Sequence, residues 1–252
     1  MKDSRCLTGH SFALGLSLLI LSVLVVQPDT SGDAPLSEKS QPMKSKSIQY
    51  RDEDLVSLAD IAPDIRIDLA FAREDHPFGQ KYYRNNVAYV RYGFARKLAE
   101  AQKRFAEKGY QLKIWEAYRP FVVQVKMFEA VGGQGDWVSD PYKSSGKKTH
   151  VRAAAVDCTL LDKDGKELAM PTPYLDFHNG SEKMKHSYQK LPLEVLANRK
   201  LLKDVMISCD LEPYSGEWWH YQDTEWAKYP VIESEEYPEM HKHLLVNELC
   251  KK

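Results

Sequence analysis

The sequence contains little cysteine and no excess charge of either sign. Four cysteines occur among its 252 residues, and no two stand at C-x-x-C spacing. Cys6 lies in the N-terminal segment, and the odd number that remains indicates neither a disulfide framework nor a thiolate zinc site, so at most one bridge can form. The formal net charge is −1, with acidic and basic residues dispersed, and nothing in this balance points to nucleic acid as a partner.

Long apolar runs are missing too, apart from one near the N-terminus. It extends from about Phe12 to Val26 and follows Lys2 and Arg5. The run is too short and wrongly flanked for a membrane span but suits a secretory signal. Residues 1–28 are therefore predicted to be a signal peptide, or an N-terminal anchor if they are not cleaved. We expect an exported protein, periplasmic or extracellular, that meets the membrane only through this segment.

The composition indicates one folded domain after a tether. Residues 29–47 are rich in Ser, Pro, Lys and Gln and lack apolar periodicity, which is typical of a flexible linker. The chain has 43% hydrophobic and 28% charged residues, enough for one sizeable core. We expect a single domain over residues 48–252 and leave its oligomeric state open.

Hydrophobic spacing predicts the main elements of this domain. Apolar residues alternate in three segments, which predicts strands, and recur at helical spacing in three others. Gly109 follows the first helical segment where a C-terminal cap is expected, and Pro120 ends the second strand. The strands are expected at 65–71, 110–115 and 153–161, and the helices at 94–105, 122–131 and 193–206.

Two short stretches carry the groups that metal chemistry needs. THVRAAAVD, which starts at position 149, contains His150 and Asp157, and GEWWHY, which starts at position 216, contains Glu217 and His220. Together they supply two imidazoles, one carboxylate that can bind metal and a second that can act as a base. Nitrogen and oxygen ligands with one position left to water characterise catalytic zinc sites, whereas structural ones are closed and usually rich in cysteine. The sequence therefore indicates a zinc peptidase.

The spacing within each stretch constrains the backbone. If extended, the chain would separate His150 from Asp157 by more than about 20 Å, so it must fold back near Arg152 for both to reach one ion. Glu217 and His220 are three residues apart and fall on opposite faces of a regular strand. Either the strand is bulged or ends there, so that both side chains serve the site, or it is regular and Glu217 is merely exposed.

The motifs in combination resemble a known family. His-x6-Asp, followed much later by Glu-Trp-Trp-His and preceded by Tyr-Arg-Pro after a strand, is similar to the D-alanyl-D-alanine dipeptidases of the VanX-like metallopeptidase family. The likeness runs from about Asp64 to Tyr221. It implies an α+β fold of the Hedgehog/D,D-peptidase type, with a central, mostly antiparallel sheet, packed helices and a metal site in a cleft. It also implies one zinc ion per chain and D-alanyl-D-alanine or a similar D,D-dipeptide as substrate.

The same resemblance assigns roles to individual residues. Carried over by position, it implies that His150, Asp157 and His220 bind zinc and that Glu217 is the catalytic base. Arg119 corresponds to the residue that stabilises the tetrahedral intermediate. Local sequence alone favours a different interpretation of Arg119, as a surface or ion-paired arginine.

Three positions bear on substrate preference. The resemblance implies that Asp176, in its Leu-Asp-Phe setting, receives the free ammonium of the substrate, while the alternative is that it only caps a turn after Pro173. The family pattern reads Ser-x-His-x-x-Gly-x-Ala-x-Asp, and here Lys148 replaces the serine and Ala153 the glycine. If the glycine position has positive φ, alanine costs roughly 1 kcal/mol there. Lys148 would place a cation beside the site and alter its preference.

Two other functions compete with the dipeptidase hypothesis. A related D,D-carboxypeptidase or endopeptidase would act on longer cell-wall peptides with the same metal site. A non-catalytic wall-binding protein with a degenerate site is suggested by Lys148 and Ala153. Glu217 argues against this last alternative, because metal binding alone does not require a base.

Overall fold

The structure is a computed structural model that describes residues 49–135, 137–143, 147–233 and 235–250. One compact unit extends from Ile48 to Lys252. The predicted signal segment and linker, residues 1–28 and 29–47, lie outside the described residues. Within the described ranges, no helix combines the length and the apolar character that crossing a membrane requires.

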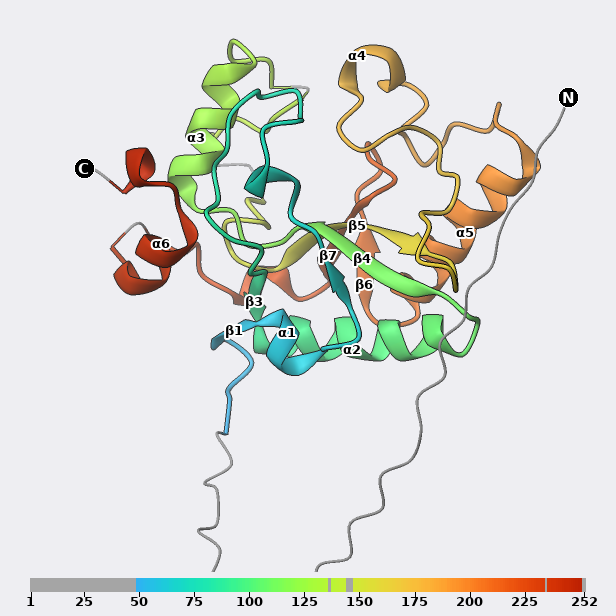
Figure 1. Ribbon diagram of the computed structural model, residues 1–252, viewed down its shortest axis with the longest axis horizontal. Coiled ribbons are helices and arrows are strands. Elements are labelled where there is room, and N and C mark those ends of the chain that lie inside the picture. Colours follow the sequence, from blue (N-terminus) through green and yellow to red (C-terminus); the bar gives the residue numbers. More distant parts are fainter. Residues whose placement is uncertain (1–48, 136, 144–146, 234, 251–252) are drawn as a thin grey trace, which may run out of the picture. The chain divides into compact units, whose positions relative to one another are not determined.

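A five-stranded sheet forms the centre of the domain, in the order β2-β4-β5-β7-β6 (Figure 1). β2 pairs with β4 in parallel, and every other pair in this sheet is antiparallel. β1 and β3 form a separate antiparallel pair. This arrangement confirms the α+β class with a mostly antiparallel sheet. The strands are β1 Leu55–Ser57, β2 Arg66–Ile67, β3 Tyr89–Arg91, β4 Gln111–Glu116, β5 Ala155–Leu161, β6 Leu211–Pro213 and β7 His220–Asp223.

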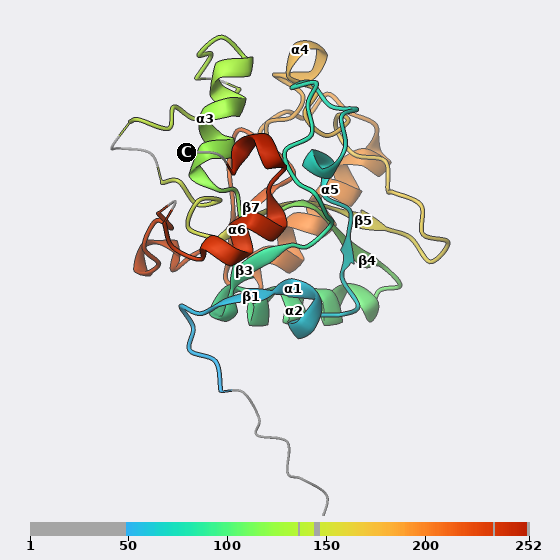
Figure 2. The ribbon, with the colours of Figure 1, turned by 60° about the vertical axis from the view of Figure 1, so that its left-hand side comes forward.

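The three long helices agree with the predicted ones within a few residues. α2 buries Phe94, Leu98 and Phe105 along one face, which packs on β4 and on α5. Gly109, at φ +81°, continues the chain just after α2. Figures 1 and 2 both place α2 on one side of the sheet and α3 and α4 on the other. The helices are α1 Leu58–Ile61, α2 Tyr92–Ala106, α3 Phe121–Ala130, α4 Phe177–Gly180, α5 Leu193–Ile207 and α6 Pro238–Leu244.

The strand predicted at 65–71 is wrong beyond its first residues. β2 covers only Arg66–Ile67, and a 3-10 helix at Ala70–Ala72 follows. Leu69 and Phe71 are nevertheless buried in the core. The alternation thus indicated burial of these side chains correctly, although they do not form a strand. The Leu69 N–H, which would pair with a neighbouring strand, donates instead to the side-chain oxygen of Asn86 at 2.6 Å.

A bulge in β4 brings three polar residues to one level of the sheet. Between Ile114 and Glu116 the register with β5 shifts, so that Glu116 lies opposite Asp157. On the other side of β5, Asp157 lies opposite His220 of β7. Directly opposed residues of antiparallel strands project from the same face. Glu116, Asp157 and His220 therefore project side by side, and Glu116 and Asp157 are almost completely buried.

Candidate metal centre

His150 reaches the centre from a tight turn before β5. The turn is closed by two backbone hydrogen bonds, from Ala153 N–H to His150 O and from Ala154 N–H to Thr149 O. It provides the fold-back predicted near Arg152. The His150 ring is held by Nδ1–H, which donates to Ala117 O at 2.7 Å. Because Nδ1 is turned to this carbonyl, Nε2 is directed at the other two residues.

The turn depends on two residues with positive φ. Ala153 has φ +58° and Lys148 has φ +52°. The glycine of the family pattern would adopt this conformation without strain, whereas a side chain there costs about 1–2 kcal/mol. Arg119 N–H also donates to His150 O at 3.1 Å, so the His150 backbone is held from outside the turn as well.

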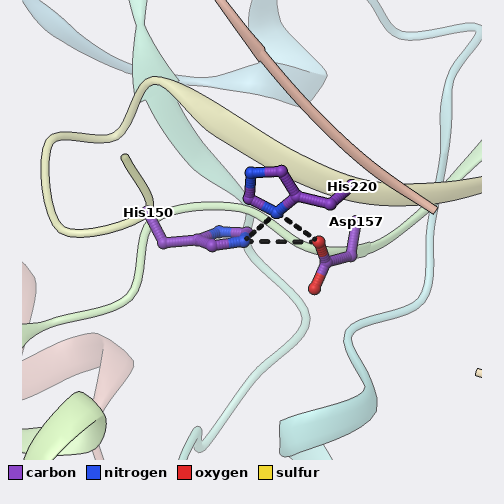
Figure 3. A group of neighbouring side chains, drawn as sticks. All are labelled: His150, Asp157 and His220. Carbon is purple, nitrogen blue, oxygen red and sulfur yellow. Dashed lines mark hydrogen bonds and ion pairs between the residues drawn. The ribbon is translucent and has the colours of Figure 1, made fainter. Parts of the chain in front are cut away.

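Three ligand atoms converge in the centre (Figure 3). His150 Nε2 lies 3.2 Å from His220 Nδ1 and 3.3 Å from Asp157 Oδ1, and the last two atoms are 3.1 Å apart. Ligands that surround a zinc ion tetrahedrally at roughly 2.0–2.1 Å are about 3.3 Å from one another. The spacing of these donors therefore fits a single metal ion, and the three residues form a possible metal site.

Asp157 presents one oxygen to the centre and has its second oxygen occupied. Tyr174 O–H donates to Oδ2 at 2.8 Å, and the Tyr174 ring stacks on Trp115 at 4.6 Å between centroids. Burial and the Asp157 charge raise the pKa of Tyr174 well above its usual value, so the hydroxyl remains a donor. Burial alone would raise the pKa of Asp157, but His150 and His220 hold it well below its usual value, and the carboxylate is ionised.

Glu217 faces the centre because β7 begins only at His220. Glu217 lies in the turn after β6, where its N–H donates to Tyr214 O and its carbonyl accepts from His220 N–H. Of the two predicted alternatives, the structure has the one in which the strand ends between Glu217 and His220. The two side chains are therefore not forced onto opposite faces of a strand. Burial, together with the charge of Asp157, raises the pKa of Glu217 to about 7, close to the optimum for a general base at neutral pH.

Arg119 is ion-paired, as local sequence favours, and it also lines the cavity described below. Its Nε donates to Glu116 Oε1 at 2.7 Å, its Nη2 to Glu116 Oε2, and its Nη1 to Gln124 Oε1 at 2.7 Å. Burial would lower the pKa of Arg119, but the Glu116 carboxylate raises it above its usual value. Two of the five guanidinium N–H groups take part in none of these three hydrogen bonds.

Sequence reasoning missed Glu116, Gln124 and Tyr174, which hold the predicted residues in place. Glu116 left one signal, an acidic residue at the end of an apolar strand and three positions before Arg119. No local signal marks Gln124 or Tyr174, because each acts on a residue that tertiary structure alone brings near.

A cavity of about 210 Å³ opens over these residues. The predicted ligands, Glu217 and Arg119 all line it, as do the apolar side chains of Leu175, Phe177 and Trp219. Asp176 is half-buried between Leu175 and Phe177 and is not among the residues that line the cavity. The structure thus brings five of the six predicted site residues to one cavity and places the sixth beside its wall.

The cavity combines a possible metal site with two further charged residues, Glu217 and Arg119, and comparison with known proteins identifies the family. The D-ala-D-ala dipeptidase model of the M15 peptidases matches residues 51–243. The chain belongs to this family, as the resemblance predicted, and is a peptidase.

Named relatives agree with this membership. The D-alanyl-D-alanine dipeptidase of Escherichia coli K12 is 31% identical over 180 residues, which cover 71% of this chain and 89% of the relative. The enzyme of the same name from Enterococcus faecium is 28% identical over 197 residues, covering 72% and 92%. A solved LD-carboxypeptidase, LdcB, is 20% identical over 69% of each chain with a TM-score of 0.39, a likeness too slight to bear on function.

The hydrogen bond from Tyr174 to Asp157 leads to a test of the centre. Tyr174→Phe keeps the ring on Trp115 but removes the hydroxyl, so Asp157 loses the partner that orients it. Outer partners of metal ligands typically contribute 10- to 100-fold to metal affinity, and we expect a loss in about that range. Competition with a chromogenic chelator measures the dissociation constant.

Tyr221→Phe is the matched control. Tyr221 follows His220 in β7, and its buried hydroxyl has no hydrogen-bond partner among the described residues. Metal affinity should not change in this variant. An equal loss of affinity in both variants would show that the Tyr174 hydroxyl has no specific role.

Proposed function

We propose that the protein is a zinc-dependent dipeptidase that hydrolyses D-alanyl-D-alanine or a similar D,D-dipeptide. The observation that carries the proposal is the convergence of His150 Nε2, Asp157 Oδ1 and His220 Nδ1 within 3.1–3.3 Å, in one cavity with Glu217 and Arg119. Relatives that bear the name D-alanyl-D-alanine dipeptidase support the choice of substrate.

The donor set supports zinc as the metal. Two imidazoles and one carboxylate suit zinc, whereas calcium and magnesium prefer oxygen ligands throughout. Three protein donors also leave a position open, as catalytic zinc sites require. Zinc held by these residues would polarise the peptide carbonyl and lower the pKa of a water molecule.

The chain itself supplies the proton transfer and the stabilisation of charge. Glu217 accepts the proton of the attacking water and passes it to the leaving amine. Arg119 donates to the carbonyl oxygen as negative charge develops there. Glu116 and Gln124 hold the guanidinium on its other edges, so it needs little reorganisation when that charge forms.

Substrate size and charge distinguish the two candidate peptidase functions. A cavity of about 210 Å³ favours a short peptide over a long one as the substrate. For a dipeptide, we propose that Asp176 receives the free ammonium, which requires its carboxylate to turn toward the cavity between Leu175 and Phe177. The apolar lining by Leu175 and Phe177 favours the second candidate, a D,D-carboxypeptidase whose substrate has an acylated, uncharged amine at this end.

Metal content tests the ligand set. His220→Ala should lower the zinc content of the purified protein from one ion per chain to a small fraction, because a site with three protein ligands cannot spare one. Elemental analysis after dialysis against buffer provides the measurement, with His178→Ala, an exposed histidine outside the cavity, as the control. Full zinc content in His220→Ala would reject the assignment.

Glu217→Ala separates chemistry from metal binding. The variant should keep its zinc and lose turnover by about 10²-fold or more, which is the usual effect of removing a general base. The measurement is kcat on D-alanyl-D-alanine at equal zinc occupancy. A kcat close to that of the wild-type protein would assign the base to another group.

Acylation of the substrate tests which peptidase function is correct. A dipeptidase should cleave D-alanyl-D-alanine and leave N-acetyl-D-alanyl-D-alanine intact, since loss of an ammonium–carboxylate pair costs on the order of 2–5 kcal/mol, or about 30-fold or more in kcat/KM. Asp176→Asn should reduce the ratio of kcat/KM for D-alanyl-D-alanine to kcat/KM for the acetylated peptide. Equal cleavage of the acetylated peptide by the wild-type protein would replace the dipeptidase by the carboxypeptidase.

A further inference from the structure

The positive charges that line the cavity differ in how they are paired. Arg119 is bound to Glu116, and Lys147 Nζ lies 3.1 Å from Glu212 Oε1. Lys148 also lines the cavity, but among the described residues no carboxylate lies within ion-pair distance of its ammonium. Its Nζ lies over the ring of Phe121, 5.6 Å from the centroid. Lys148 is thus a lining cation that a bound anion can pair with.

The position of Lys148 matches one end of a short peptide. It stands two residues before His150, so the two Cα atoms are separated by no more than about 7 Å. Its φ of +52° and the hydrogen bond from Arg152 N–H to its carbonyl fix its backbone at the start of the ligand turn. The carboxylate of a peptide cleaved at its last bond lies one residue, about 3.8 Å in Cα spacing, beyond the reacting carbonyl. The flexible side chain of Lys148 can span this range.

A terminal carboxylate that enters this cavity needs such a partner. Part of the wall is apolar, at Leu175, Phe177 and Trp219, and cannot replace the water that the carboxylate loses. Arg119 is engaged by Glu116 and Gln124, and in the proposed mechanism it serves the reacting carbonyl. Asp140, which also lines the cavity, has the wrong charge to bind an anion.

We propose that Lys148 binds the C-terminal carboxylate of the substrate and so restricts the enzyme to peptides that end one residue beyond the cleaved bond. The inference rests on the proposed peptidase chemistry and adds a requirement to it. Dipeptides and acylated peptides both meet this requirement if their C-terminal carboxylate is free. The substrates of an endopeptidase do not, because the bond that it cleaves lies in the interior of the chain.

The test compares D-alanyl-D-alanine with its C-terminal amide, which differs only in the terminal charge. Lys148 is half-exposed, so the contribution lies between that of a surface ion pair and that of a buried one. We expect the wild-type protein to prefer the acid by about 10-fold in kcat/KM, and Lys148→Met to lose most of this preference. Lys148→Arg should retain it, and high salt should weaken it in the wild-type protein.

Lys147→Met is the matched control, because Lys147 lines the same cavity but is paired with Glu212. It should keep the preference for the acid. A preference that survives in Lys148→Met, or that falls equally in Lys147→Met, overturns the proposal.

A binding experiment separates this inference from the proposed function. Calorimetry with zinc-loaded Glu217→Gln measures the affinity for both peptides without turnover. The dipeptidase function fails if the wild-type protein cleaves neither peptide. The role of Lys148 still stands in that case if Glu217→Gln binds the acid more tightly than the amide and the additional change Lys148→Met abolishes this difference. Equal affinity for acid and amide in Glu217→Gln, or binding of neither, overturns the role of Lys148.

Discussion

The centre depends on the register of three neighbouring strands. Glu116, Asp157 and His220 are opposite one another across β4, β5 and β7 only because the bulge in β4 shifts its pairing after Ile114. A regular β4 would place Val156 opposite Glu116 and turn the carboxylate to the other face of the sheet. The charge partner of Arg119 would then be lost, although every metal ligand would remain in place.

Each buried charge in this region has a partner, either an opposite charge or a hydrogen-bond donor. These partners reduce the free-energy cost of burying so many polar groups together. The Asp157 carboxylate accepts from Tyr174 and faces two imidazoles, and the Arg119 guanidinium is neutralised by Glu116. Removing one member of a buried pair leaves an uncompensated charge and is strongly destabilising, by about 3–5 kcal/mol in typical cases. Changes at Glu116 are therefore expected to affect folding as well as catalysis.

The sequence predicted most of the centre and much of the fold, because several of its signals are local. The spacing of His150, Asp157, Glu217 and His220 lies within two short motifs, and the long helices follow from apolar periodicity. The bulge in β4 depends on pairing with a distant strand, and Tyr174 reaches Asp157 through a contact that periodicity does not encode. The alternation at 65–71 misled because burial of alternate residues does not require a strand partner.

The positive φ of Ala153 and the long sequence separation of the ligands have a consequence for the thermodynamics of the whole domain. His150 and His220 are 70 positions apart, so their nitrogens meet only when β5 and β7 have paired and the turn has closed. The unfolded chain offers the ion no such donor set, and an ion at 1,000 times its dissociation constant would stabilise the native state by about 4 kcal/mol. This exceeds the roughly 1–2 kcal/mol that an alanine with positive φ costs, so a family member that keeps its metal can tolerate this departure from glycine.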